Sequence, residues 1–204
     1  MVTKGTSSGR RRRAPKPLDQ RALNDLALSY VARFATSSGK LEAYLRRKIR
    51  ERGTQLGAQS EEDLDEGGGQ NEGARLDVSA VVARMVELRY VDDEAYARSK
   101  AGGLLRRGYG GRRVEQALRA DGIEDQLRSD VAPKEKEARL AAFALAEKRR
   151  FGPFGSEPVD RAKQEKQIAA MIRAGHGFDS ARALISAQTI EQVEEWLAQA
   201  DDYD

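Results

Sequence analysis

The sequence predicts an all-α protein made of three tandem three-helix repeats that form an elongated, curved array. Of its 204 residues, 34% are charged and 39% are hydrophobic, and Ala, Arg, Leu and Glu dominate. Apolar residues recur at intervals near 3.6 along almost the whole chain, which is the period of amphipathic helices, and no segment shows convincing strand alternation. Similar helical pieces also recur, and three-helix units of this size gain stability by packing on their neighbours.

Two gapless alignments carry the internal similarity. Residues 45–53 match residues 114–122, and residues 81–95 match residues 167–181, with apolar and charged positions in common. Each pair reads as a helix followed by a short junction, as expected for units that repeat along a chain.

The first predicted unit covers residues 18–91. Its first helix, 19–34, begins at an aspartate that can cap it and carries one continuous apolar stripe. Its second helix, 40–52, is followed by Gly53, a residue typical of the position just after a helix. Its third helix, 77–89, carries valines and a methionine on its inward face.

Two segments have the composition of disordered or flexible chain. Residues 1–17 are rich in Ser, Gly, Pro and Arg and predict a disordered basic arm. Residues 54–76, inside the first unit, contain five glycines and six acids and predict a flexible acidic insert. The insert could screen the basic helix before it, or it could be a tolerated surface insertion.

The second predicted unit covers residues 92–132. It contains a helix that begins at a pair of aspartates and stops near Gly108, a helix over about 112–121, and a short polar turn or helix over 124–131. The glycine pair Gly102–Gly103 lies inside the first of these helices and costs about 1 kcal/mol per glycine relative to Ala. These glycines could permit close packing or a bend.

The third predicted unit covers residues 133–200. Its helices are expected over 134–149, 159–174 and about 178–185. A last helix begins with a capping box at Thr189.

Positive charge is concentrated at the start of the chain and in local clusters. Residues 1–55 carry 14 Lys or Arg and 4 acids, whereas the whole chain has a net charge of only +3. Such clusters suit a polyanion or an acidic protein surface as the partner. Guanidinium groups bind phosphates and carboxylates bidentately, although any one arginine can equally be ordinary solvated helix surface. The candidate contacts are Arg46, Arg47, Arg50, Arg106, Arg107, Arg112, Arg113 and Arg119.

The sequence has no feature of an enzyme site. It lacks cysteine, which excludes thiolate chemistry and zinc–cysteine sites. His176 is the only histidine and follows a glycine in a turn without an evident Ser or Cys partner, so we expect it to be structural or exposed. The GYGG stretch at 108–111 lacks the spacing of a phosphate-binding loop. We therefore predict neither catalysis nor a bound metal or cofactor.

Two other groups of residues have both a functional and a structural interpretation. The acids at 92–94 suggest a cation site, but helix capping explains them better, because carboxylates favour the positive end of the helix dipole. Tyr90, Tyr96 and Tyr109 could stack on nucleic-acid bases. We favour the interpretation that these tyrosines seal helix junctions.

Signals for export or membrane insertion are missing from the sequence. No stretch is apolar enough to span a membrane. The basic N-terminus has no apolar core behind it and is not a secretory signal. Together with the lack of cysteine, these features favour a cytoplasmic location.

Three stretches of the sequence together match a known family: SGKLEAYLRRKIRERG at 38–53, residues 82–123, and IAAMIRAGHGFDSARALI at 168–185. They resemble the RecX family of bacterial recombination regulators. The middle stretch follows the family's succession of a short hydrophobic turn, an acidic Asp-Asp-Glu start, a basic helix and a Gly-x-x-Arg-Ile element, here GGRRV at 110–114. The resemblance covers about residues 20–187.

The resemblance implies a bent, mostly monomeric protein of three three-helix repeats that binds the RecA recombinase filament in its helical groove. It implies modulation, usually inhibition, of ATP hydrolysis and strand exchange in DNA repair and the SOS response, with DNA binding by some members. The chain departs from the family pattern at the 54–76 insert and at Arg89, where a small residue is usual.

Two other function classes fit the same residues. A general helical DNA-binding protein would affect RecA only by competing for single- or double-stranded DNA, and its affinity would fall steeply with salt. A solenoid-type scaffold would bind proteins alone.

Overall fold

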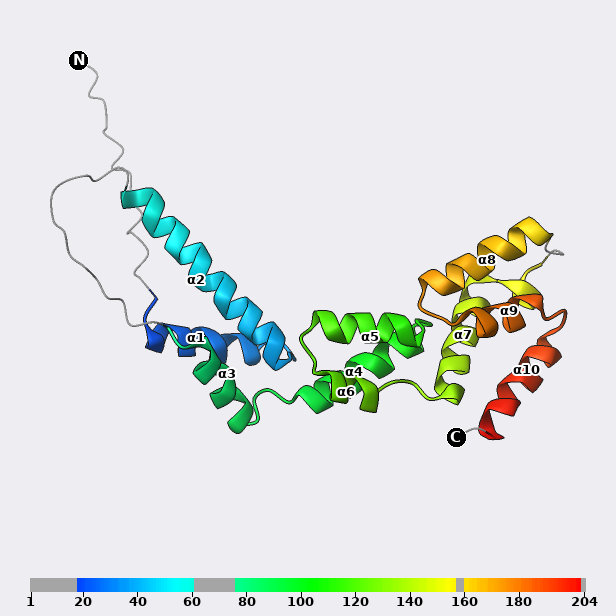
Figure 1. The fold of residues 1–204 in the computed structure, drawn as a ribbon, viewed down its shortest axis with the longest axis horizontal. Helices are drawn as coiled ribbons and strands as arrows, with labels where there is room; N and C mark the ends of the chain where they lie inside the picture. Colours follow the sequence, from blue (N-terminus) through cyan, green and yellow to red (C-terminus); the bar gives the residue numbers. More distant parts are fainter. Residues whose placement is uncertain (1–17, 61–75, 157–159, 203–204) are drawn as a thin grey trace, which may run out of the picture.

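The computed structural model describes residues 18–60, 76–156 and 160–202, and over these residues it contains α-helices and two short 3₁₀ turns but no strand. The predicted all-α fold is confirmed. Figure 1 shows the helices in a row of three groups, with α2 at one end and α8 near the other rising to the same side, so the array is elongated and bent. The basic arm predicted for 1–17 lies outside the described residues.

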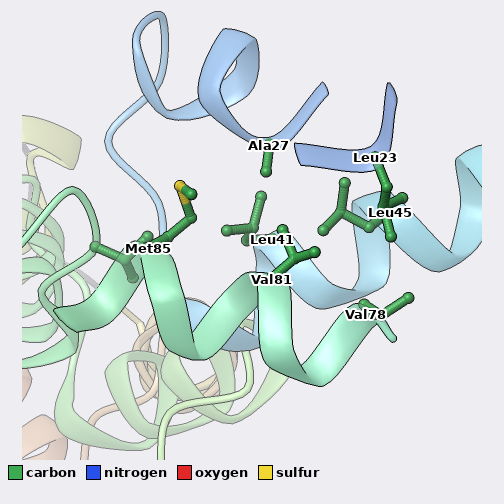
Figure 2. Packing of buried hydrophobic residues seen from close by; sticks show 8 residues of the cluster. Leu23, Ala27, Leu41, Leu45, Val78, Val81 and Met85 are labelled. Carbon is green, nitrogen blue, oxygen red and sulfur yellow. The ribbon is translucent and has the colours of Figure 1, made fainter. Parts of the chain in front are cut away.

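The first group contains α1 (Gln20–Val31), α2 (Ser38–Ser60) and α3 (Val78–Glu87). As predicted, Asp19 caps α1, because its carboxylate accepts a hydrogen bond of 2.6 Å from the backbone N–H of Ala22. The three helices turn apolar side chains towards one core, which Figure 2 shows from close by. The buried members of this core are Leu23, Ala27, Leu41, Leu45, Val78, Val81, Met85 and Val91.

Helix α2 does not end at Gly53, so the predicted stop there is wrong. The helix continues to Ser60, and residues 54–60 of the predicted flexible insert are helical. A Cβ at Gly53 would meet nothing within 4 Å, so no neighbouring element forces the chain to turn away. The glycine penalty of about 1 kcal/mol alone is too small to end a helix. The rest of the insert, 61–75, lies outside the described residues.

The second group contains α4 (Asp93–Arg106), α5 (Gly111–Ala120) and the short α6 (Asp125–Asp130). Of the two aspartates that could cap α4, Asp92 does so, accepting a hydrogen bond of 2.9 Å from the backbone N–H of Ala95. The core of this group is smaller than that of the first. Its buried members are Ala97, Ala101, Leu104, Val114, Leu118 and Ile123.

The third group contains four helices and two 3₁₀ turns: α7 (Glu135–Arg149), η1 (Gly152–Phe154), α8 (Arg161–Arg173), α9 (Phe178–Ser186), α10 (Ile190–Ala198) and η2 (Gln199–Asp202). Helix α10 packs on α7 and buries Val193 in the same core as α7, α8 and α9. A fourth helix therefore belongs to this group, where a strict three-helix repeat has three.

The three cores lie within the ranges 18–91, 92–132 and 133–200, and these unit limits stay a prediction. The two internal alignments differ in what they superpose. The first pairs α2 with α5, which are the second helices of their groups. The second pairs α3 and the start of α4 with α8 and the start of α9. It therefore reflects a shared helix–turn–helix pattern and not the period of the array.

Candidate functional site at the joints between helix groups

Neighbouring helix groups meet at two joints that are built alike. At the first joint, the turn between α1 and α2 meets the C-terminal end of α5. At the second joint, the turn between α4 and α5 meets the C-terminal end of α8. Glycines allow the close approach, since a Cβ at Gly39 would lie 2.7 Å from the Cα of Gly122, and one at Gly110 would lie 2.4 Å from the carbonyl carbon of Gly175.

Polar side chains hold the first joint. The Ser37 hydroxyl donates to the backbone carbonyl of Asp121 at 2.5 Å. The backbone N–H of Ser38 donates to the Asp93 carboxylate at 2.8 Å. The Tyr96 hydroxyl donates to the Asp121 carboxylate at 2.7 Å. Tyr96 is thus part of the joint, which agrees with the sealing role that we favoured for it.

Asp121 is the centre of this polar network. Its side chain is only 12% exposed and pairs with the ammonium groups of Lys40, at 3.5 Å, and Lys100. Burial by itself would raise the pKa of Asp121, but hydrogen bonds from Lys100 and Tyr96 and the two lysine charges outweigh it and hold the pKa below its usual value. Burial and the neighbouring carboxylate raise the pKa of Tyr96.

Backbone hydrogen bonds hold the second joint. The N–H of Gly110 donates to the carbonyl of Ala174 at 2.9 Å, and the N–H of Arg112 donates to the carbonyl of Gly175 at 3.2 Å. Main-chain groups make these bonds, and the glycines that allow the close approach fix the position of the α4–α5 turn.

His176 adds a buried side chain to the second joint. It is 3% exposed, and its Nε2 lies 3.0 Å from the carbonyl oxygen of Gly108, to which the neutral ring donates. Burial lowers the pKa of His176, and the bond to the Gly108 carbonyl opposes this only in part. The histidine is therefore structural. Among the described residues, no group of three or more His, Asp or Glu is placed to hold a metal ion.

The eight candidate arginines are all exposed, and those on α2 and at the end of α5 have partners. Arg46, Arg47 and Arg119 each pair with a glutamate four residues away in their own helix, at distances of 2.6, 3.5 and 2.7 Å. Arg50, also on α2, has an interaction partner as well. Each such pair largely cancels the local charge that a polyanion would meet.

The other four candidates, Arg106, Arg107, Arg112 and Arg113, flank the turn between α4 and α5, and we call them the arginine corner. Within the described part of the chain none of their guanidinium groups has a carboxylate partner, and Arg107 Nε donates to the backbone carbonyl of Gly103 at 3.0 Å. The corner therefore presents four uncompensated cations around a turn fixed by the second joint. Such an arrangement can bind phosphates or carboxylates.

The polar residues of the first joint were not predicted as a site. The stretch TSSG at 36–39 reads only as a junction, and Asp121 only as the residue before a helix-ending glycine. A signal was nevertheless present, because small residues cluster in both turns, 36–39 and 108–111, at matching positions between the first and second helices of two units.

Known proteins similar to this chain point to one family. A family model described as "RecX, second three-helix domain" matches residues 92–131, which contain α4, α5 and α6. The sequence is 31% identical over 180 residues to regulatory protein RecX of Myxococcus xanthus, which covers 85% of this chain and 89% of that protein. The chain belongs to the RecX family. It is a regulatory protein that modulates RecA and not an enzyme, as the sequence predicts.

Two further RecX proteins agree with this assignment. Regulatory protein RecX of Thermus thermophilus is 29% identical over 158 residues, with coverage of 78% of this chain and 87% of that one. The crystal structure of RecX from Lactobacillus salivarius superposes with a TM-score of 0.57 at 18% identity and covers 88% of this chain and 97% of that chain. At this identity the structural match supports the fold alone. None of the described helices is long and apolar enough to cross a membrane.

Proposed function

We propose that this RecX-family chain inhibits RecA by lying in the helical groove of the filament, across adjacent subunits, and depressing ATP hydrolysis and strand exchange. The observation that supports this best is the arginine corner, whose four exposed cations lack a carboxylate partner in the described structure. Because backbone hydrogen bonds already fix the α4–α5 turn, little conformational entropy is lost when it binds. An elongated, bent array suits a curved groove.

The partners of the arginine corner in this proposal are the phosphates of the filament's DNA and acidic patches of its protein. The paired arginines on α2 and Arg119 contribute less, because each brings its own glutamate to the interface. An exposed pair four residues apart is worth only about 0.3–0.5 kcal/mol, so the difference arises from local charge and not from the energy needed to break the pair. The chain acts as a cytoplasmic monomer in DNA repair and the SOS response.

The direct test is the ATPase activity of RecA on single-stranded DNA. Addition of this protein in several-fold molar excess over RecA is expected to lower the rate of ATP hydrolysis, and strand exchange should fall in parallel. A rate that stays constant, or rises, contradicts inhibition.

A second candidate function is general DNA binding, with RecA affected only through competition for DNA. The exposed arginines favour it because guanidinium groups bind phosphates as readily as carboxylates. Equal affinity for naked DNA and for the filament would support it. The affinity would then fall by about 0.9 log unit per log unit of salt for each phosphate neutralised on duplex DNA. Preference for the filament supports the first proposal.

A further inference from the structure

A groove of about 480 Å³ runs along α4 beside the first joint. Tyr90 lies before the start of α4 and Arg107 just after its end, so the groove follows the length of the helix. The residues that line the groove between Tyr90 and Arg107 are mostly apolar or small. Its members include Ala35, Thr36, Ala95 and Gly103.

Gly103 in this groove has no role in the packing of the chain itself. A helical glycine is less stable than alanine, so a glycine needs a reason. The glycines of the joints have one, since a Cβ there would collide with backbone. A Cβ at Gly103 would meet only the tip of the Arg106 side chain, at 4.0 Å. The missing side chain at Gly103 thus leaves space in the groove on α4, and no contact within the chain requires that space.

One end of the groove carries an exposed ring and the other end a cation. Tyr90 is 56% exposed. Arg89 beside it is also exposed and holds a φ of 58°, a left-handed conformation that glycine adopts without strain. The Arg107 guanidinium donates to the backbone carbonyl of Gly103. The one carboxylate in the lining, Asp92, is already used to cap α4. An apolar groove with an uncompensated cation at one end, and Arg89 next in sequence to its other end, is complementary to an apolar segment that carries carboxylates.

We propose that this groove docks a segment of the filament's protein component that combines apolar side chains with carboxylates. The proposal rests on the proposed function, in which the filament is the partner. Tyr90 and the space at Gly103 accommodate the apolar side chains, and Arg107 and Arg89 bind the carboxylates. A nucleic acid fits less well, because its phosphates need cations along the whole path and the middle of this groove has only Lys100, which is paired with Asp121.

Two adjacent glycines provide a matched pair of variants. Gly103→Leu fills the groove, whereas Gly102→Leu places the same side chain in a different hollow, beside Val131 and Lys134. A Cβ at Gly102 would lie 3.2 Å from Arg106 Nη1, but this exposed side-chain tip can move aside, and both variants remove a helical glycine, so both should keep or raise the melting temperature. We expect Gly103→Leu to weaken binding to RecA filaments on single-stranded DNA by about tenfold, as loss of a buried anchor does, and Gly102→Leu to leave it unchanged. Both should keep wild-type affinity for naked single-stranded DNA.

Several results would overturn the docking groove. One is wild-type filament affinity in Gly103→Leu, and another is an equal loss in Gly102→Leu, which would trace the effect to the helix. An equal loss of affinity for naked DNA would make nucleic acid the occupant. If the wild-type protein itself fails to bind filaments, both the proposed function and the docking proposal are wrong. If the wild type binds and Gly103→Leu binds equally well, only the docking proposal is wrong.

Discussion

The two joints share one geometry but use different chemistry. In both, the turn between the first two helices of one group meets the end of the second helix of the next, and glycines allow backbone to touch backbone. Side chains centred on Asp121 hold the first joint, whereas backbone hydrogen bonds and a neutral histidine hold the second. The second joint therefore needs no carboxylate, and the cations of the arginine corner beside it remain uncompensated. The difference suggests why we propose binding at the second joint and not at the first, although both joints hold neighbouring groups together.

The largest expected effect is that of Gly110→Ala at the second joint. The new Cβ would lie 2.4 Å from the backbone of Gly175, and neither backbone can move without breaking the hydrogen bonds between the two segments. We expect the free energy of unfolding to fall by about 3 kcal/mol or more, as for a severe packing clash. Urea denaturation measures it. A loss below about 1 kcal/mol would show that the joint is not closed as described.

The next effect is expected for Asp121→Ala at the first joint. It leaves two lysines and a tyrosine without their shared acceptor, and because the lysines are partly exposed we expect a loss of about 2 kcal/mol rather than the full cost of a buried charge. Asp125→Ala is the control, because the Asp125 side chain is 90% exposed although it too pairs with a cation. Equal losses in the two variants would contradict a central role for Asp121.

Acid should weaken the second joint before the first. The pKa of His176 is lowered by burial, so the unfolded state, whose histidine pKa is about 6.5, binds more protons and stability falls as the pH drops through that value. The pKa of Asp121 is lowered too, but its contribution is complete above the unfolded aspartate pKa of about 3.9 and is lost only below it. Urea midpoints measured at about pH 7 and about pH 5 test this order. His176→Gln should reduce the fall in stability between these two pH values. A fall as large as that of the wild type would mean that other groups cause it.

The smallest effect is expected for Gly53→Ala, at the end of the array where no joint forms. Gly53 corresponds to Gly122 in the alignment, but among the described residues no other group packs on α2 at Gly53, and a Cβ there would meet open space. Alanine should stabilise the continuing helix by about 0.5–1 kcal/mol. Gly122→Ala should instead destabilise, because Gly122 has a φ of 75° and Gly39 lies 2.8 Å from its Cβ position. If both variants stabilise the protein, or both destabilise it, the contrast between Gly53 and Gly122 is wrong.

Features determined by neighbours along the chain were predictable from the sequence. The caps at Asp19 and Asp92 follow from local hydrogen bonding. The pairing of Arg46 and Arg119 follows from spacing, since each has a glutamate four residues earlier. Spacing does not predict the whole contrast between paired and uncompensated arginines, because Arg112 has Glu115 three residues later and yet Glu115 pairs with Arg119.

Features determined by contacts between distant segments were not predictable. Ser37 and Asp121 are 84 residues apart, and no local pattern links them. The end of α2 was mispredicted at Gly53 for the same reason. Gly122 follows the end of α5 at a joint, whereas the aligned Gly53 lies inside α2, which continues because no described neighbour meets it there. The groove along α4 depends on which face of that helix the neighbouring group leaves open.

The central claim, that the arginine corner acts on the RecA filament, is tested most directly with two charge-matched double variants in the RecA ATPase assay. Arg112→Glu with Arg113→Glu reverses two uncompensated cations, and Arg46→Glu with Arg119→Glu reverses two that are paired. With equal melting temperatures, we expect the corner variant to need at least about tenfold more protein for the same inhibition and the control to stay close to wild type. A corner variant that inhibits as well as the wild type, or equal losses in both variants, would contradict the claim.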